Sequence, residues 1–335
     1  MNTARSTIII LSLAFLFSQN LVAQDPIFSQ FYSAPLQINP AFAGNTYTPR
    51  VALNYRNQWS GWVGLPYETY AASYDQFIER LNIGVGLMAL TDDAGNGLFR
   101  ISKISGFFSY RAKVNDQFFL KLGVEAGAWQ TRIGVDKLVF GDELDRIDGF
   151  TGDLQSEEIL RLDNKTVFDV SAGLLAYGPM FYGGVSIKHI NNPDDRLIEE
   201  TENVSSGLPL RFSLHGGAQL TLKEGNRKKL SSFISPNILF ENQSDLSQLN
   251  LGVYAALGPI FAGGWFRHTF GNADAVIGLI GFRQKAFKIG YSYDFTVSSP
   301  LNTTNNQGTH EISFVINFDH NRSKINYNDC FQLFR

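Results

Sequence analysis

Apolar and polar residues alternate along much of this chain, most clearly in its C-terminal third. In residues 247–257, SQLNLGVYAAL, leucine, valine and alanine occupy every second position, with polar, small or amphipathic residues between them. A side-chain period of two predicts a β-strand with one apolar face. Gly258-Pro259 interrupts the pattern before residues 259–270 resume it, which indicates two strands joined by a two-residue turn.

The same unit repeats along the chain, at about the 9–11 residues that a tilted strand needs to cross a bilayer. Breaks rich in Gly, Pro, Asn and Asp separate the repeats. We therefore predict an all-β fold, a closed antiparallel transmembrane β-barrel of about 14 strands with an irregular N-terminal segment and a short C-terminal tail. The predicted strands are residues 49–57, 67–75, 82–91, 99–112, 116–129, 167–177, 180–190, 209–222, 230–241, 247–257, 259–270, 272–284, 286–298 and 307–318.

The connections between these strands tend to alternate in length. Bacterial outer-membrane barrels have short periplasmic turns, long external loops and an even number of strands. The sequence therefore predicts an integral outer-membrane protein with both termini in the periplasm. The short connections are residues 76–81, 113–115, 178–179, 223–229, 258–259 and 284–286, and the long ones include 58–66, 92–98, 130–166, 191–208 and 299–306.

Charged residues fall on the strand face opposite the apolar one. A charge on the lipid side would cost about 2–4 kcal/mol at mid-bilayer, so these side chains are predicted to face the lumen. Because both signs occur, the lumen is expected to be wet or filled by salt-bridged side chains. The residues predicted to face the lumen include Lys121, Glu125, Arg211, His215, Lys288 and Asp294.

The two ends of the chain differ from the barrel pattern. A basic start, the apolar run TIIILSLAFLF and a small residue at the end predict a secretory signal peptide, cleaved near Ala23/Gln24. The single cysteine, Cys330, lies close to the C-terminus and is interpreted as an incidental thiol. The predicted divisions are 1–23 (signal peptide), 24–48 (irregular periplasmic or plug-like segment), 49–318 (barrel) and 319–335 (periplasmic tail).

Composition and spacing argue against several function classes. A net charge of −3 gives no basic surface for nucleic acid. The histidines form no HxH or HxxxH pair and no nucleophile stands beside a base, so we predict no metal site, cofactor or enzyme activity. His189, His268 and His310 fall near external strand ends, where a ring at the membrane interface is expected. Acidic residues gather in the loops at 130–166 and 191–208, where solvated charge is favoured over binding of divalent cations.

The segment before the first strand is apolar but broken by prolines. Such a segment must be buried against the barrel or a partner. The stretch QWSGWVGLPY in the first external loop suits either an aromatic girdle or a protein-binding edge. The residues predicted to form a plug or partner-binding site are Asp25, Pro26, Phe28, Gln30, Phe31, Tyr32, Asn39, Pro40, Phe42, Gly44, Trp59 and Trp62.

The stretch QDPIFSQFYSAPLQINPAFAG, followed by YRNQW, resembles the N-terminal signature of the PorP/SprF family of Bacteroidota outer-membrane proteins of type IX secretion and gliding motility. Resemblance implies a non-enzymatic barrel that supports secretion or surface anchoring of a large adhesin, recognised through its C-terminal targeting domain. Resemblance to a second branch of the family implies instead a motor-associated barrel that contacts periplasmic ring proteins and a peptidoglycan-binding lipoprotein. The long external loops favour the first branch. A tail after the last strand departs from the family pattern.

The charged lumen positions leave a different class open, that of a general porin or solute channel. About fourteen strands enclose enough space for a pore. The sequence does not determine whether side chains or the N-terminal segment block that pore. A steady open-channel current in a planar bilayer would favour the porin.

Overall fold

The computed structural model describes the barrel and parts of both chain ends. Trp59 and Trp62 lie outside the described residues, as do the predicted signal peptide and most of the two acidic loops. The described residues are 25–46, 48–58, 67–134, 144–145, 149–150, 164–197, 207–225, 230–270, 274–284, 286–297, 308–318, 330–332 and 334.

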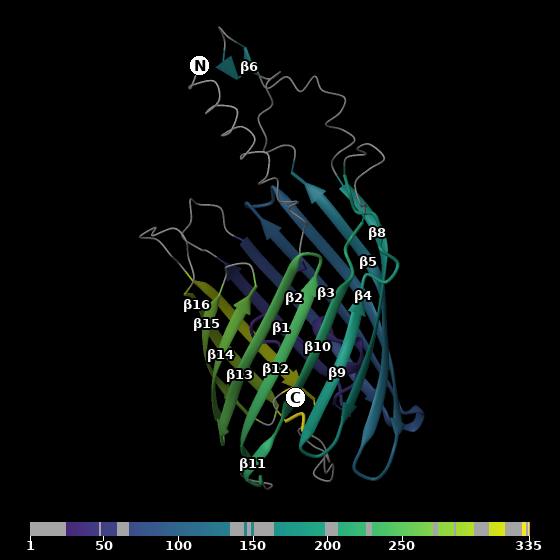
Figure 1. The fold of residues 1–335 in the computed structure, drawn as a ribbon, viewed down its shortest axis with the longest axis vertical. Helices are drawn as coiled ribbons and strands as arrows, with labels where there is room; N and C mark the ends of the chain where they lie inside the picture. The colour runs from purple at the N-terminus through teal and green to yellow at the C-terminus, as the bar shows by residue number, and fades with distance from the viewer. Residues whose placement is uncertain are drawn as a thin grey trace, which may run out of the picture.

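One antiparallel sheet closes on itself as a barrel (Figure 1). The first and last strands pair from Arg50↔Asn317 to Asn57↔His310, which closes the barrel. Strands β10 and β11 follow one another along β12, so the barrel has fourteen strand positions, as predicted. The strands are β1 (Arg50–Gln58), β2 (Tyr67–Ile78), β3 (Ile83–Ala94), β4 (Phe99–Lys113), β5 (Phe119–Ile133), β8 (Asn164–Tyr177), β9 (Phe181–Lys188), β10 (Arg211–Ala218), β11 (Leu220–Lys223), β12 (Ser232–Gln243), β13 (Leu246–Leu257), β14 (Ile260–Thr269), β15 (Ala275–Arg283), β16 (Phe287–Thr296) and β17 (Thr309–Asn317).

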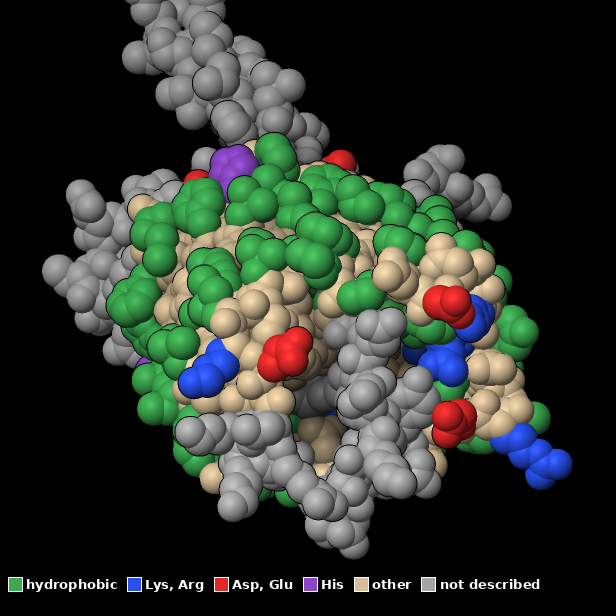
Figure 2. All heavy atoms as spheres, turned by 90° about the horizontal axis from the view of Figure 1, so that it is seen from below, with side chains coloured by type: hydrophobic (Ala, Val, Ile, Leu, Met, Phe, Trp, Pro, Cys, Tyr) green, Lys and Arg blue, Asp and Glu red, His purple; other side chains and the backbone are tan. Residues whose placement is uncertain are grey.

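Alternation of side chains sorts each strand into an inner and an outer face. On β5, Leu122 is 56% exposed and Val124 52% exposed, whereas Lys121 before them and Glu125 after them are buried. The outer wall is therefore apolar, as a bilayer requires. Figure 2 shows the barrel end-on, with hydrophobic side chains on the outer wall and charged side chains at the near rim.

The two ends of the barrel differ in their connections (Figure 1). One end, the short-turn end, carries turns such as Gly258-Pro259, where Gly258 adopts a φ of +62°. A positive φ followed by proline fits a type II′ hairpin turn, which matches the twist of the strands. The opposite, long-loop end carries most of the longer connections, including the 134–163 connection with the hairpin of β6 (Leu144–Asp145) and β7 (Gly149–Phe150).

Helical structure in the described residues is limited to short turns. Inside the barrel lie α2 (Pro35–Ile38) and the 3₁₀ turn η1 (Pro40–Phe42), and the turn η2 (Glu79–Leu81) joins β2 to β3. None of the helices in these described ranges is long and apolar enough to cross a membrane.

The described ends of the chain lie at opposite ends of the lumen. Asp25 bonds to His189 and Gln243, which lie where β9 and β12 reach the long-loop end. Strand β1 starts at the short-turn end, so the segment from Asp25 to Arg50 runs the length of the barrel. That both termini face the periplasm stays a prediction, and strand patterns do not reveal a segment threaded through the lumen.

The described part of the C-terminal tail packs inside the barrel. Cys330, Phe331 and Phe334 are at most 2% exposed and belong to the main hydrophobic cluster inside the barrel. Cys330 is thus part of the packed interior, which the interpretation as an incidental thiol did not anticipate.

Candidate functional site

The N-terminal segment, defined here as residues 25–46, lies in the lumen and is the candidate site. Every residue from Phe28 to Thr46 is buried. An apolar, proline-broken segment has no ladder partners of its own, so its backbone groups need partners from the wall. The wall supplies them at three places.

First, the turn η1 rests on small residues of the wall. A Cβ added to Gly123 would lie 2.2 Å from the backbone nitrogen of Ala41, and one on Gly84 would lie 2.1 Å from the carbonyl oxygen of Ala43. Only glycine permits such a close approach of two backbones. The wall residues, called here the small-residue row, are cross-strand neighbours on β3, β4, β5, β8 and β9: Gly84, Ser109, Gly123, Gly173 and Ser186.

Polar wall atoms hold the carbonyl groups of this turn. Ser109 Oγ and Lys121 Nζ donate to the carbonyl oxygen of Ala43 at 2.8 and 2.6 Å. Ser186 Oγ donates to the carbonyl oxygen of Ile38 at 2.6 Å. Lys121, predicted to face the lumen, thus binds the N-terminal segment.

Asn39 organises the turn and joins it to the wall. Its Oδ1 accepts the N–H of Ala41 at 2.8 Å as an N-cap, and proline follows at the first helical position. Its Nδ2 donates to the carbonyl oxygens of Leu174 and Val185 at 3.0 and 3.1 Å. The ring nitrogen Nε2 of His215 lies 3.0 Å from the same Nδ2. The sequence Asn-Pro-Ala therefore combines a cap, a rigid start and a residue small enough for the wall.

Gly44 ends the turn in a left-handed conformation, with a φ of +68°. Its N–H donates to Asp75 Oδ2 at 2.9 Å, and Arg50 Nε donates to the other carboxylate oxygen at 2.7 Å. Arg50 and Asp75 are both 1% exposed, so this ion pair is fully enclosed.

Second, Glu311 on β17 holds the start of the segment. Its two carboxylate oxygens accept the N–H groups of Ser29 and Gln30 at 2.7 and 2.8 Å, and Arg56 Nη1 donates to it at 3.1 Å. Charge-assisted bonds of this kind are stronger than neutral ones. Asp294 accepts Ser29 Oγ at 2.6 Å, so two acidic residues bind one turn of the segment.

The charges around Ser29 are balanced. Arg56 pairs with Asp294 at 3.3 Å, and Arg267 pairs with the same Asp294 oxygen at 3.1 Å. Both arginines also donate to Ser29 Oγ at 2.6 Å. Two arginines thus face two carboxylates, which is the condition for keeping charges buried.

The amide of Gln30 makes a further set of bonds. Its Nε2 donates to Ser292 Oγ at 3.1 Å and to the carbonyl oxygen of Glu311 at 2.9 Å. Its Oε1 accepts the hydroxyls of Tyr32 and Ser313 at 2.9 and 2.6 Å. The predicted site residue Gln30 therefore connects two neighbouring strands, β16 and β17.

Third, Asp25 is held at the long-loop end of the lumen. His189 Nε2 lies 3.0 Å from its carboxylate, and Arg211 Nη1 donates to it at 3.3 Å. Gln243 accepts the N–H of Asp25 at 3.0 Å. His189 also contacts Asp169 through Nδ1 at 2.9 Å, and this fully buried ring corrects the prediction of a histidine at the membrane interface.

A chain of ion pairs continues from this point along the wall. Lys103 pairs with Asp169 at 3.1 Å and with Glu125 at 2.8 Å, and Lys188 pairs with Glu125 at 3.3 Å. The charged lumen is therefore filled by salt-bridged side chains, one of the two possibilities derived from the sequence.

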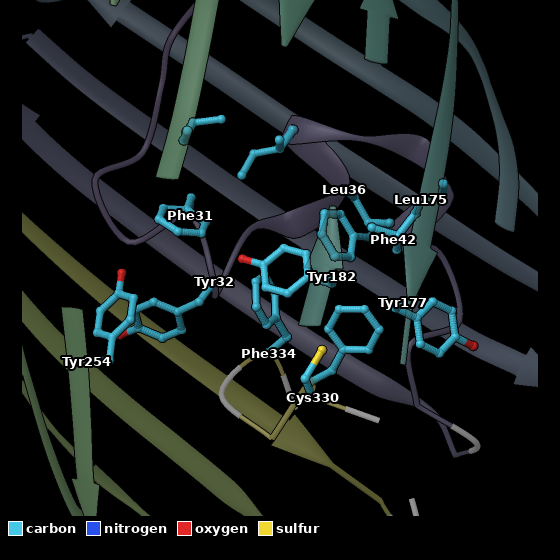
Figure 3. Packing of buried hydrophobic residues seen from close by; sticks show 14 of the residues in the cluster. Phe31, Tyr32, Leu36, Phe42, Leu175, Tyr177, Tyr182, Tyr254, Cys330 and Phe334 are labelled. Carbon is cyan, nitrogen blue, oxygen red and sulfur yellow. The ribbon is translucent and has the colours of Figure 1, made fainter. Parts of the chain in front are cut away.

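Aromatic rings of the N-terminal segment pack against rings of the wall inside the barrel (Figure 3). Phe31 lies edge-on to Trp265 at 4.7 Å, and Tyr32 lies edge-on to Tyr254 at 5.1 Å. Phe42 lies 5.1 Å from the ring of His215, which is buried on β10 and faces the lumen. Edge-to-face rings at these separations stabilise packing beyond the area they bury.

The structure thus brings most of the predicted site residues together in the lumen. Asp25, Gln30, Asn39 and Gly44 make the polar contacts. The sequence did not assign Glu311 or His189 to this site, because each acquires its role only from the segment opposite it. The described predicted site residues that pack in the lumen are Asp25, Pro26, Phe28, Gln30, Phe31, Tyr32, Asn39, Pro40, Phe42 and Gly44. In the described ranges, no group of three or more His, Cys, Asp or Glu side chains has the arrangement of a metal site.

The bonds of Asp25 predict a pH dependence. Burial alone would raise its pKa, but the positive charges of His189 and Arg211 hold the pKa of this carboxyl well below its usual range. A lowered folded-state pKa means that the contribution of Asp25 is complete above its unfolded-state value of about 3.9 and is lost as the pH falls through the folded-state value. Hydrogen exchange of residues 25–28, corrected for intrinsic rates, should therefore accelerate below about pH 4.

Asp25→Asn provides the control for this measurement. It removes the charge while keeping the shape, so exchange in this part of the segment should already be fast at pH 7. Asp169 and Glu241 lie near Asp25 through their contacts with His189 and Arg211, and both carboxyl groups remain in the variant. If the exchange rate rose equally with acid in both proteins, the rise would belong to these groups, and the role of Asp25 would be contradicted.

Comparison with known proteins gives a family and a fold. Residues 20–316 match the model of the family described as type IX secretion system membrane protein PorP/SprF. A solved TodX deltaS2S3 mutant monoaromatic hydrocarbon channel has a TM-score of 0.50 at 10% identity, covering 84% of this chain and 93% of that one. The Pseudomonas putida toluene transporter TodX has a TM-score of 0.49 at 8% identity, covering 89% and 98%. The first of these supports a shared barrel fold alone. No curated protein matches the sequence.

Proposed function

Since the chain belongs to the PorP/SprF family of type IX secretion system membrane proteins, we propose that it serves secretion without enzymatic chemistry. Its client is a large adhesin-type protein, which it helps to secrete or anchors at the cell surface by recognising the client's C-terminal targeting domain. The protein is an outer-membrane β-barrel, and in this proposal its long-loop end faces the cell exterior and its short-turn end the periplasm.

The observation that carries this proposal is the buried N-terminal segment. It occupies the path that a client or solute would take, and buried bonds fix it to β5, β8, β9, β16 and β17. The client is therefore expected to bind at one end of the barrel and not to pass through it. The long loops provide the larger external contact area.

The same observation argues against a general porin. Charged side chains that would line an open pore are used in buried contacts, as Lys121 and Glu125 are. We expect the native barrel to show no steady open-channel current in a planar bilayer.

The second branch of the family gives an alternative, a barrel that works with the secretion motor. Its partners would be periplasmic ring proteins and a peptidoglycan-binding lipoprotein. These partners would contact the short-turn end, whereas a surface client would contact the long-loop end. The two functions therefore differ in which end of the barrel is occupied.

Photocrosslinking from both ends distinguishes them. A photoreactive residue replaces Asp245, exposed in the turn after β12 at the long-loop end, or Asp116, exposed in the turn after β4 at the short-turn end. Mass spectrometry of crosslinked cells should recover a large secreted protein, through its C-terminal domain, from position 245. Lipid-facing Leu122 serves as the control position.

Capture of ring proteins or a lipoprotein from position 116 alone would replace the anchor proposal with the motor-associated one. If neither position captured a protein in secreting cells, both proposals would be contradicted and a channel function would be favoured.

A further inference from the structure

The C-terminal tail packs among aromatic rings inside the barrel (Figure 3), beside the short turn between β8 and β9. The ring of Phe334 stacks on Phe42 at 5.2 Å with an interplanar angle of 15°. The ring of Phe331 lies 5.0 Å from Tyr177 and 5.5 Å from Tyr182. Two phenylalanines three positions apart thus occupy a pocket made jointly by the N-terminal segment and the wall.

Polar contacts fix the backbone between the two rings. The N–H of Gln332 donates to Gln219 Oε1 at 3.2 Å, and Ser231 Oγ donates to the side-chain oxygen of Gln332. Arg50 Nη1 donates to the carbonyl oxygen of Phe334. Arg50 also pairs with Asp75, which binds Gly44, so the same ion pair contacts both ends of the chain.

The tail is held differently from the N-terminal segment. Carboxylates bind the backbone of Ser29, Gln30 and Gly44, whereas Phe331, Gln332 and Phe334 contact aromatic rings, neutral polar groups and Arg50. Residues 319–329 connect the tail to β17. A covalent tether keeps a ligand at a high effective concentration near its site, so modest contacts suffice to hold the tail in place.

We propose that Phe42, Tyr177 and Tyr182 form a peptide-binding site for a segment of the form Phe-x-x-Phe, and that the end of the chain occupies it as a tethered, exchangeable ligand. Without the tail, these rings would face water at the mouth of the barrel, which apolar surfaces of this kind avoid by binding. The inference is independent of which client or motor protein the barrel serves.

The single native cysteine allows a direct test on the full chain. Cys330 is 2% exposed, so a maleimide reacts with it only when the tail has left the pocket. The purified barrel in detergent is labelled in the presence of a synthetic peptide of residues 328–335 with serine at position 330. A saturating peptide should raise the labelling rate about tenfold or more, because it replaces the tail after each release.

The same peptide with both phenylalanines changed to alanine is the matched control and should leave the rate unchanged. A chain that ends at Phe318 should bind the fluorescent native peptide, and its retained heat-modifiable migration on a gel reports that the barrel remains folded. Labelling as fast as in the denatured protein would show that the tail does not dock. The proposal would also be contradicted if the labelling rate stayed the same at every peptide concentration. It would equally be contradicted if the peptide did not bind to the shortened chain.

Discussion

Gly123→Ala is expected to displace the N-terminal segment from the wall and to give a conducting barrel. The new Cβ would lie 2.2 Å from the nitrogen of Ala41 and 2.4 Å from the carbonyl carbon of Pro40, and neither backbone atom can move without moving η1. Overpacking of this kind costs about 1–3 kcal/mol, and here it acts on the docking of one segment. Planar-bilayer recordings should show channel openings in the variant and none in the native protein.

The chain offers a matched control for the loss of a strand glycine. A Cβ added to Gly264 on β14 would meet no atom within 4 Å. Gly264→Ala should therefore leave the barrel closed and at least as stable, because alanine has less conformational freedom to lose on folding. Equal conductance in Gly123→Ala and Gly264→Ala would mean that contact with the small-residue row does not keep the segment in the lumen.

Glu311→Ala is expected to have the largest effect on stability. The carboxylate is fully buried and binds the N–H groups of Ser29 and Gln30 together with Arg56, so its loss leaves a buried cation and two donors without their acceptor. Breaking a buried ion pair on one side costs about 3–5 kcal/mol. The denaturant midpoint should fall, and chymotrypsin should cleave at Phe28 and Phe31 in the folded barrel.

An exposed ion pair provides the comparison for this variant. Arg100 pairs with Asp93 near the long-loop end, and the Arg100 side chain is 46% exposed. Asp93→Asn should change stability by about 0–1 kcal/mol, as surface pairs do. If Glu311→Ala changed stability no more than Asp93→Asn and kept residues 28–31 protected, Glu311 would not be an anchor of the segment.

Much of the barrel follows from the sequence alone. A period of two determines which face of each strand meets lipid, so Leu122 and Lys121 could be assigned to opposite faces without a structure. Gly and Pro at positions such as Gly258-Pro259 determine where strands end. These features are local, since each depends on neighbours within a few residues, and the strand count followed from them.

The sequence also determined that residues 25–46 need a cover, because an apolar segment without a strand or helix period has to be buried. Only the tertiary structure decided what covers it. Glu311, 281 residues from Gln30, becomes an anchor because strand closure places β17 opposite that turn. The same holds for His189, which strand position alone assigned to the membrane interface.

The C-terminal tail shows the same limit. Its pattern of two phenylalanines is visible in the sequence, but the pocket consists of Phe42 from the N-terminal segment and Tyr177 and Tyr182 from two strands. Contacts between segments so far apart depend on barrel closure and strand register, which bring the residues together only after the whole sheet has formed. The sequence by itself therefore determined the wall of this protein, and the tertiary structure decided what fills it.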